Sequence, residues 1–288
     1  MPAFDLGPGF AAAPQVEPAV DDGLRGALLR RLREQGFALL QPAQLGELCG
    51  FDARDCAAAT SLWDDLPPDP YLKDGGHYRR RRHGSFVHEL QGGEQQARGL
   101  VQVPHRAHYQ PLTYNALHGG LVRWLEPLDP RLCELPCWRS LLPGLGELFA
   151  QLRHQPRWYV EAHQFRIDTA GGIGRPTPEG AHRDGVDFVA VLLVRRRDIR
   201  GGESRVFELQ GARGVRFTLR QPWSVLLMDD TRVIHETTPI QPEFDAGAGC
   251  RDTLVLTWRA GGFLDPPPAH AGDDFAQARG HVKPAPGA

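Results

Sequence analysis

The stretch 177–185 holds a histidine and an aspartate two positions apart, His182 and Asp184. On an extended backbone, side chains at i and i+2 project from the same face, so both can approach one metal ion. His235, in a second extended stretch at 233–237, is the natural third ligand. Two imidazoles and one carboxylate on one face of an octahedron leave three positions open, which suits Fe(II) when it must also bind O2 and a bidentate co-substrate. The spacing therefore predicts an iron centre held by these three side chains.

Each piece also has a simpler interpretation when it is taken alone. A His-x-Asp pair is common on polar surface strands, and a single distant histidine is unremarkable. The placement favours a metal site, because both pieces fall on expected strands of one β-rich region, about fifty residues apart.

A second pair of side chains, Arg251 and Thr253, opens the strand expected at 253–258 and shares one face of it. The planar guanidinium makes two parallel charge-assisted hydrogen bonds to a carboxylate, and a neighbouring hydroxyl can add a third. This pair could hold the distal carboxylate of 2-oxoglutarate. The alternative is a surface ion pair between Arg251 and Asp252, and the residues alone leave the two interpretations open.

The elements that position these residues change in type near Pro156. Before it, leucines recur at helical spacing, and helices are expected from Leu24 to Leu32 and in the ranges 45–63, 115–126 and 138–153, with a loop-rich segment at 71–114. After it, short apolar runs alternate with turn residues, which is typical of a β-sandwich or barrel. The expected strands are 160–167, 188–194, 205–209, 215–219, 224–228, 233–237 and 253–258.

The expected fold class is therefore α+β, a C-terminal jelly roll with helical N-terminal support. We expect a flexible arm at 1–20, one domain at 21–260 and a Pro/Gly-rich tail at 261–288. Within the domain, the helical support is expected at 21–158 and the jelly-roll core at 159–260. No linker separates the two halves, so they form one functional unit.

Composition excludes some partners. Lys and Arg number 33 and Asp and Glu 35, giving a formal charge of −2, so no overall field favours nucleic acid or an anionic membrane. No apolar run approaches the ~20 residues that span a bilayer, and the first residues do not resemble a secretory signal. Five scattered cysteines indicate reduced thiols and a cytoplasmic setting. The oligomeric state is not predicted.

Several motifs together resemble the Fe(II)- and 2-oxoglutarate-dependent dioxygenases, and more narrowly their bacterial isoleucine-dioxygenase-like subgroup of free-amino-acid hydroxylases. The motifs cover roughly residues 70–260 and comprise 78–82, 104–106, 114–115, 163–167, 177–185, 201–204, 229–235 and 251–252. The resemblance implies a double-stranded β-helix (cupin-like) fold. It implies iron at His182, Asp184 and His235, and 2-oxoglutarate at Arg251, although the gap from His235 is longer than is usual in the wider superfamily.

The same resemblance implies a coupled oxidation, in which O2 oxidises 2-oxoglutarate to succinate and a small substrate, an L-amino acid, is hydroxylated. Related halogenases have a small residue in place of the carboxylate ligand, so Asp184 favours hydroxylation. An amino acid needs a cation for its carboxylate and an anion for its ammonium group. The expected substrate-binding residues are Arg80 in the arginine run 79–82, Gln164, Arg166 and Asp187.

Two alternatives remain at this point. The chain could be a dioxygenase that acts on a peptide or a larger biosynthetic intermediate. It could also be a non-catalytic jelly roll that binds a metal or ligand in stress or biofilm signalling, although such a protein need not keep both the triad and the Arg-x-Thr pair.

Overall fold

The computed structural model describes residues 10–12, 23–90, 99–115, 117–244 and 247–267. A large sheet has the strands β2 (Phe37–Leu40), β3 (Arg79–Glu89), β4 (Gly99–Gln102), β7 (Arg157–Asp168), β8 (Phe188–Arg197), β12 (Val225–Asp229) and β15 (Cys250–Arg259). Their order is β2-β12-β8-β15-β7-β3-β4, and every neighbouring pair is antiparallel.

A smaller sheet packs beside it and has the strands β1 (Phe10–Ala12), β10 (Ser204–Glu208), β11 (Gly214–Phe217) and β13 (Val233–Thr237). Its order is β1-β11-β10-β13. Two further ladders pair β9 (Ile199–Gly201) with β14 (Ile240–Pro242) and β5 (His108–Tyr109) with β6 (Val122–Arg123). The large antiparallel sheet and the smaller one, in which only the β1–β11 pair is parallel, confirm the expected jelly roll.

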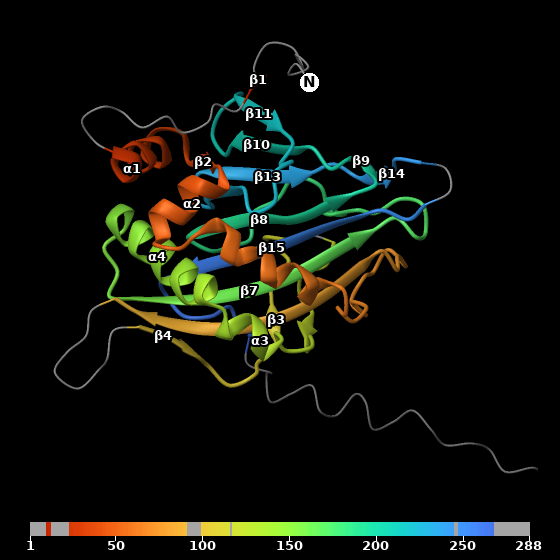
Figure 1. Cartoon of the computed structure of the whole chain (residues 1–288), viewed down its shortest axis with the longest axis horizontal. Helices are drawn as coiled ribbons and strands as arrows, with labels where there is room; N and C mark the ends of the chain where they lie inside the picture. The colour runs from red at the N-terminus through yellow and green to blue at the C-terminus, as the bar shows by residue number, and fades with distance from the viewer. Residues whose placement is uncertain (1–9, 13–22, 91–98, 116, 245–246, 268–288) are drawn as a thin grey trace, which may run out of the picture.

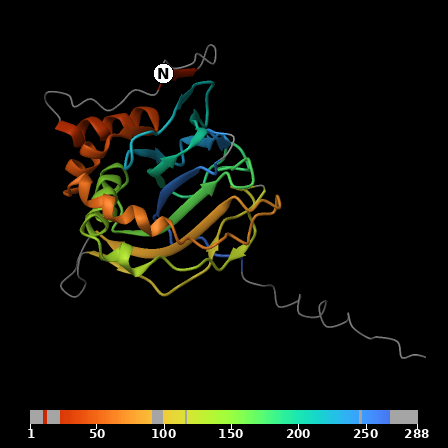
Figure 2. The same ribbon diagram turned by 45° about the vertical axis from the view of Figure 1, so that its right-hand side comes forward.

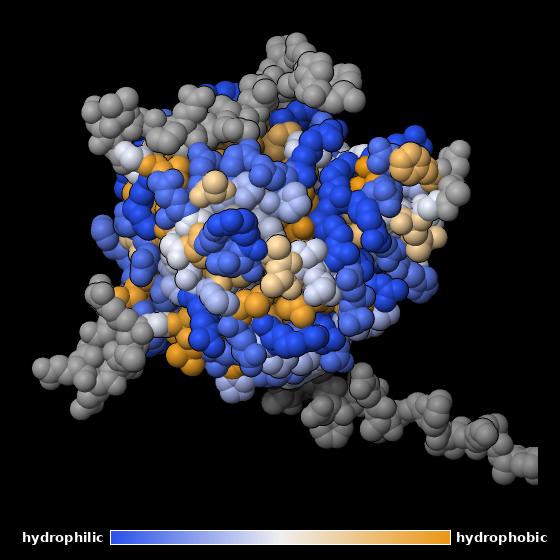
Figure 3. All heavy atoms as spheres, in the orientation of Figure 1, coloured by the Kyte–Doolittle hydropathy of each residue, from blue (hydrophilic) through white to orange (hydrophobic). Residues whose placement is uncertain are grey.

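Helices gather on one side of the large sheet (Figures 1 and 2). They are α1 (Gly23–Gln35), α2 (Pro42–Cys49), the 3₁₀ helix η1 (Ala53–Trp63), α3 (Pro130–Glu134) and α4 (Pro136–Leu152). None of the helices in the described ranges is long and apolar enough to cross a membrane. On the face shown in Figure 3, hydrophilic residues predominate and hydrophobic ones are scattered among them.

The central strands are buried on both faces, and alternate residues enter two different cores. On β8, Phe188, Ala190 and Leu192 join the core beneath the helices, together with Trp63 and Trp258. The residues between them face the smaller sheet, where Val189 and Leu193 belong to a second core. This two-residue period decides which side chains of β3, β7 and β15 can reach a site between the sheets.

Three local expectations were wrong. Segment 71–114 was expected to be rich in loops, but it contains the strand β3. The four consecutive arginines of β3 concealed the alternation of side chains that would have indicated a strand. Range 115–126 is not helical in its described residues: Gly120 has φ of 74°, and a Cβ on Gly119 would lie 2.3 Å from the Asn115 carbonyl oxygen. The helix expected at 45–63 divides into α2 and η1 at Gly50, which has φ of 76°. Of the expected arm, only β1 is described, so the domain division stays a prediction.

A buried carboxylate ties the central strands together on the helical side of the large sheet. Asp252 on β15 is fully buried and accepts two hydrogen bonds of 2.7 Å from Arg166 on β7. Arg195 on β8 lies 3.1 Å from the same carboxylate. Both arginines also donate to Asp64, just after η1, at 2.9 Å. This cluster fixes β15 between its neighbours.

We predict that Asp252→Ala lowers the free energy of unfolding by ~3–5 kcal/mol, because two arginines lose their buried partner. Urea denaturation measures the change. The matched control is Asp64→Ala, which removes the carboxylate from the same two arginines at a half-exposed position and should cost ~1 kcal/mol or less. Equal losses in the two variants would contradict this account.

Candidate metal centre and its cavity

The two predicted histidine ligands are joined through their backbones. The His182 N–H donates to the His235 carbonyl, and the His235 N–H donates back, both at 3.0 Å. His235 lies on β13, and His182 forms an isolated bridge beside it rather than a full strand. The ring centroids are 4.6 Å apart. Distant parts of the sequence are thereby brought to one point at the edge of the smaller sheet.

The ring nitrogens and the Asp184 carboxylate converge. The Asp184 oxygens lie 3.7 Å from Nε2 of His182 and 3.8 Å from Nε2 of His235. One ligand atom from each residue falls within 4.8 Å of the others. His182 donates its Nδ1–H to the Gly180 carbonyl at 3.0 Å, which leaves Nε2 with a lone pair for a metal. This donor set fits a divalent iron ion.

The charges at this point are also those a cation requires. Burial, together with the neighbouring His182, lowers the pKa of His235 well below its ordinary value, so this imidazole is neutral. Burial also tends to lower the pKa of His182, but the carboxylates of Asp184 and Glu179 outweigh it and raise that pKa. The two carboxylates therefore favour positive charge at this point, and the same carboxylates would stabilise a bound cation.

A further aspartate holds the backbone of the ligand loop. Asp230 is 1% exposed, and its carboxylate accepts N–H bonds from Asp184 at 3.0 Å, Gly185 at 2.9 Å and Val186 at 3.1 Å. Gly185 has φ of 81°, and a Cβ there would lie 2.4 Å from Cδ2 of Tyr114. No local sequence pattern predicts this role of Asp230, because the contact joins two loops.

A cavity opens beside the three predicted ligands, and Arg251 and Thr253 are in its wall. Both are buried, at 4% and 3% exposure. Nη2 of Arg251 has no hydrogen-bond partner in the described part of the chain. Burial, with the charge of nearby Arg196, lowers the pKa of Arg251 to about 10. The surface ion pair with Asp252 that the sequence left open does not form, because Asp252 points to the opposite face.

The four expected substrate-binding residues do not line this cavity. Gln164 and Arg166 lie on the helical face of β7, where Gln164 donates to the Leu62 carbonyl at 3.3 Å and Arg166 binds Asp252. Asp187 pairs with Arg153 and accepts the Ala260 N–H at 2.9 Å. Arg80 is 42% exposed, 3.7 Å from Asp168. The correction has a simple reason: the odd-numbered residues of β3 and β7 face the cavity, and the even-numbered ones face away.

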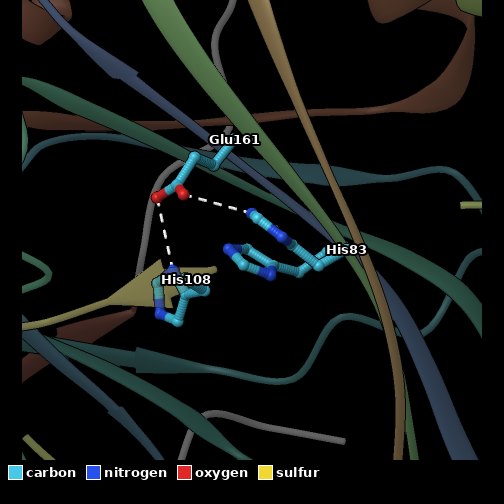
Figure 4. A group of neighbouring side chains, drawn as sticks. His83, His108 and Glu161 are labelled. Atoms are coloured by element: carbon cyan, nitrogen blue, oxygen red, sulfur yellow. Dashed lines mark hydrogen bonds and ion pairs between the residues drawn. The ribbon is translucent and has the colours of Figure 1, made fainter. Parts of the chain in front are cut away.

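One wall of the cavity is a cluster that the sequence analysis did not identify (Figure 4). Glu161 on β7 is buried, and its two oxygens lie 3.1 Å from Nε2 of His83 and 3.3 Å from Nδ1 of His108. Burial lowers the pKa of His83 and takes that of His108 to about 4, so both rings are neutral near neutral pH. Two neutral imidazoles therefore donate to one buried carboxylate.

This wall, with His163, is a second group of metal-ligand type. Two arginines border it. Arg106 lies 3.6 Å from the Glu161 carboxylate, and Arg81 donates to Nδ1 of His163 at 3.1 Å. Two positive charges at this place oppose a second divalent cation. The triad of His182, Asp184 and His235 has no arginine within ion-pair distance of its carboxylate in the described residues.

Comparisons with known proteins agree with this geometry. The profile of a family described as 2OG-Fe dioxygenase matches residues 60–257. A crystal structure of a bsmA homolog from Methylobium petroleophilum PM1 is 56% identical, covers 87% of this chain and all of that chain, and has a TM-score of 0.79. No match was found among curated proteins.

More distant solved structures share the fold. IDO from Bacillus thuringiensis is 15% identical, with a TM-score of 0.66 over 84% of this chain and all of that one. An oxidoreductase of the 2OG-Fe(II) oxygenase family from Burkholderia pseudomallei is 16% identical, with a TM-score of 0.50 over 88% of this chain and 98% of that one.

We predict that Asp184→Ala weakens Fe(II) binding by more than ~100-fold, since even an outer-shell partner of a metal ligand contributes up to that factor. Anaerobic Fe(II) titration and metal content after desalting measure this, with one tightly bound ion expected in the unaltered protein.

Asp187→Ala is the control for that experiment. It removes an aspartate side chain three residues after Asp184, where the carboxylate binds Arg153 instead of facing the cavity. This variant should keep its iron. Tight stoichiometric iron in Asp184→Ala would rule out the predicted ligand set.

Proposed function

Because the chain belongs to the 2OG-Fe dioxygenase family, whose members use Fe(II), 2-oxoglutarate and O2, we propose that it hydroxylates a free L-amino acid on its aliphatic side chain. We assign iron to His182, Asp184 and His235. The observation that carries the proposal is the convergence of these three side chains at a cavity lined by the buried guanidinium of Arg251, whose Nη2 has no hydrogen-bond partner among the described residues.

The protein's part in this reaction is to position the reactants. The two imidazoles and the carboxylate would hold the iron and leave coordination positions for the co-substrate and O2. Iron, when bound, supplies the oxidative chemistry, and the chain supplies binding, orientation and electrostatics. Arg251 and Thr253 hold the distal carboxylate of 2-oxoglutarate, which satisfies the free Nη2 of the arginine.

The proposed reaction balances. One oxygen atom of O2 enters the substrate C–H bond as a hydroxyl group, and the other becomes part of succinate. 2-Oxoglutarate loses CO2 and supplies two electrons, and the substrate carbon supplies the other two. Because Asp184 fills the third protein position, the arrangement supports hydroxylation rather than halogenation.

The amino-acid substrate is supported by the sequence resemblance and by the character of the cavity. Its lining contains arginine side chains as well as carboxylate oxygens, the two kinds of charge that a zwitterionic ligand requires. We further propose a cytoplasmic setting, which is supported by five cysteines that are all free.

We predict that Arg251→Met weakens 2-oxoglutarate binding by ~2–5 kcal/mol, the loss expected when one partner of a buried charge pair is removed. Titration of 2-oxoglutarate into the Mn(II)-loaded protein measures it. Metal affinity should stay unchanged, because Arg251 is not a ligand. The control is Arg197→Met, an exposed arginine on β8 that pairs with Cys250, the residue before Arg251. An unaltered affinity in Arg251→Met would place the anchor elsewhere.

A panel of the common L-amino acids tests the substrate class. Succinate formed only in the presence of one member, together with a product sixteen mass units heavier, is the expected result. Coupling to a peptide or carrier-bound substrate alone would move the assignment to a larger substrate. No consumption of 2-oxoglutarate by the iron-loaded protein would favour a non-catalytic role.

A further inference from the structure

A second group of cations, on β3 and β6, lines the same cavity as Arg251. Arg79 and Arg81 of β3 share one buried carboxylate, that of Asp69, at 2.7 and 3.8 Å. Burial raises the pKa of Asp69, but the two guanidiniums outweigh it and hold that pKa below its ordinary value. One carboxylate thus serves two arginines, which leaves one positive charge in excess.

Arg123 of β6 adds another positive charge beside them. It is 2% exposed and lines the cavity, and no carboxylate in the described ranges lies within 4.0 Å of it. It donates to the His118 carbonyl, while its Nε and the Nε of Arg81 have no hydrogen-bond partner there. The opposite charges of Asp69 and Glu179 act on Arg123 only from a distance. A buried guanidinium without a directly bound counter-ion is costly, so its place in the wall of this cavity indicates an anionic ligand.

The carboxylate of Glu179 is a negatively charged hydrogen-bond acceptor between Arg123 and the metal centre. Its Oε1 accepts from Asn115 at 3.3 Å and lies 3.5 Å from Nε2 of His182. Its Oε2 is buried without a hydrogen bond, 3.9 Å from Nδ1 of His118. The other non-ligand carboxylate of the cavity, Glu161, already accepts from two histidines. Among the described residues that line the cavity, Glu179 is therefore the non-ligand carboxylate that keeps an oxygen without a hydrogen bond.

We propose that Arg123, with the free Nε of Arg81, binds the substrate carboxylate and that Glu179 binds the substrate ammonium group. This inference rests on the proposed function, because it names how the same site recognises an amino acid. The contacts run from His182 through Glu179 and His118 to Arg123, so the ammonium group binds nearer the iron and the carboxylate farther from it.

The position of this subsite separates the two carboxylate-bearing reactants. Arg251 belongs to β15, whereas Arg123 belongs to the small β5–β6 ladder. Different sheets therefore position the two arginines. 2-Oxoglutarate has no ammonium group for Glu179 to bind. Its negative charges are instead repelled by the Glu179 carboxylate. The substrate subsite and the co-substrate subsite are therefore distinguished by charge as well as by place.

The test is calorimetric titration of the Mn(II)- and 2-oxoglutarate-loaded protein with three series of probes. These are the common L-amino acids, their primary amides, which lack the carboxylate, and their N-acetyl derivatives, which lack the ammonium group. At least one amino acid should bind, and its amide and N-acetyl derivative should each bind at least ~30-fold more weakly.

Two variants test the carboxylate site and the ammonium site separately. Arg123→Met should bind the amino acid and its amide with similar affinity, and Glu179→Gln should lose the preference for the free ammonium group over the N-acetyl form. Mn(II) content and 2-oxoglutarate affinity should be unchanged in both. Arg131→Met, an exposed arginine paired with Asp129, is the control and should behave as the unaltered protein.

A thermal melt separates binding from a structural role. Arg123→Met removes an unpaired buried charge and keeps the length of the side chain, so its Tm should equal or exceed that of the unaltered protein. A lower Tm with weakened binding of all ligands would make Arg123 structural and overturn the assignment.

The remaining outcomes are also decisive. Amides that bind as well as acids, or an Arg123→Met variant that still discriminates between them, would overturn the carboxylate site, as would binding of none of the three series. Loss of Mn(II) in Glu179→Gln would make Glu179 a metal ligand and overturn the ammonium site. Arg123-dependent binding of N-acetyl derivatives alone would keep the carboxylate site and refute the proposed free-amino-acid substrate.

Discussion

The reciprocal hydrogen bonds between the backbones of His182 and His235 are the constraint on which the site depends. They bind a loop to the edge strand β13, at 3.0 Å in each direction, and so fix two imidazoles side by side. The third ligand follows from the same bridge, because Asp184 is two residues from His182 and its backbone N–H is held by Asp230. A metal site assembled on backbone hydrogen bonds needs little reorganisation when the ion binds.

Alternation along β15 places two kinds of charge on opposite faces of one strand. Asp252 faces the helices and, together with Asp64, neutralises the charges of Arg166 and Arg195 on that side of the sheet. Arg251 faces the cavity, and its Nη2 has no hydrogen-bond partner in the part of the chain that the structure describes, so its charge is left for a ligand. Side chains alternate in the same way on β3 and β7, where Arg81 and His163 face the cavity. Stability and binding therefore use alternate residues of the same strands.

Sequence reasoning went furthest where the information was local or apolar. The strands after Pro156 were predicted because their apolar runs end at turn residues, and the His-x-Asp spacing needs only an extended backbone. It failed where polar residues form buried structure: β3 carries a run of arginines that resembles a solvated loop. The substrate residues could not be chosen because one sequence does not fix which face of β7 points inward. Glu161 and Arg123 depend on contacts between distant elements, which no local pattern reports.

The central claim is that one metal ion binds at the bridge between His182 and His235, with 2-oxoglutarate anchored on Arg251. The most direct measurement is a crystal structure of the protein loaded with Mn(II) and 2-oxoglutarate, with the metal located by its anomalous scattering. The account predicts one anomalous peak per chain, bonded to Nε2 of both histidines and to Asp184. A peak among His83, His108, Glu161 and His163, with the triad empty, would contradict it.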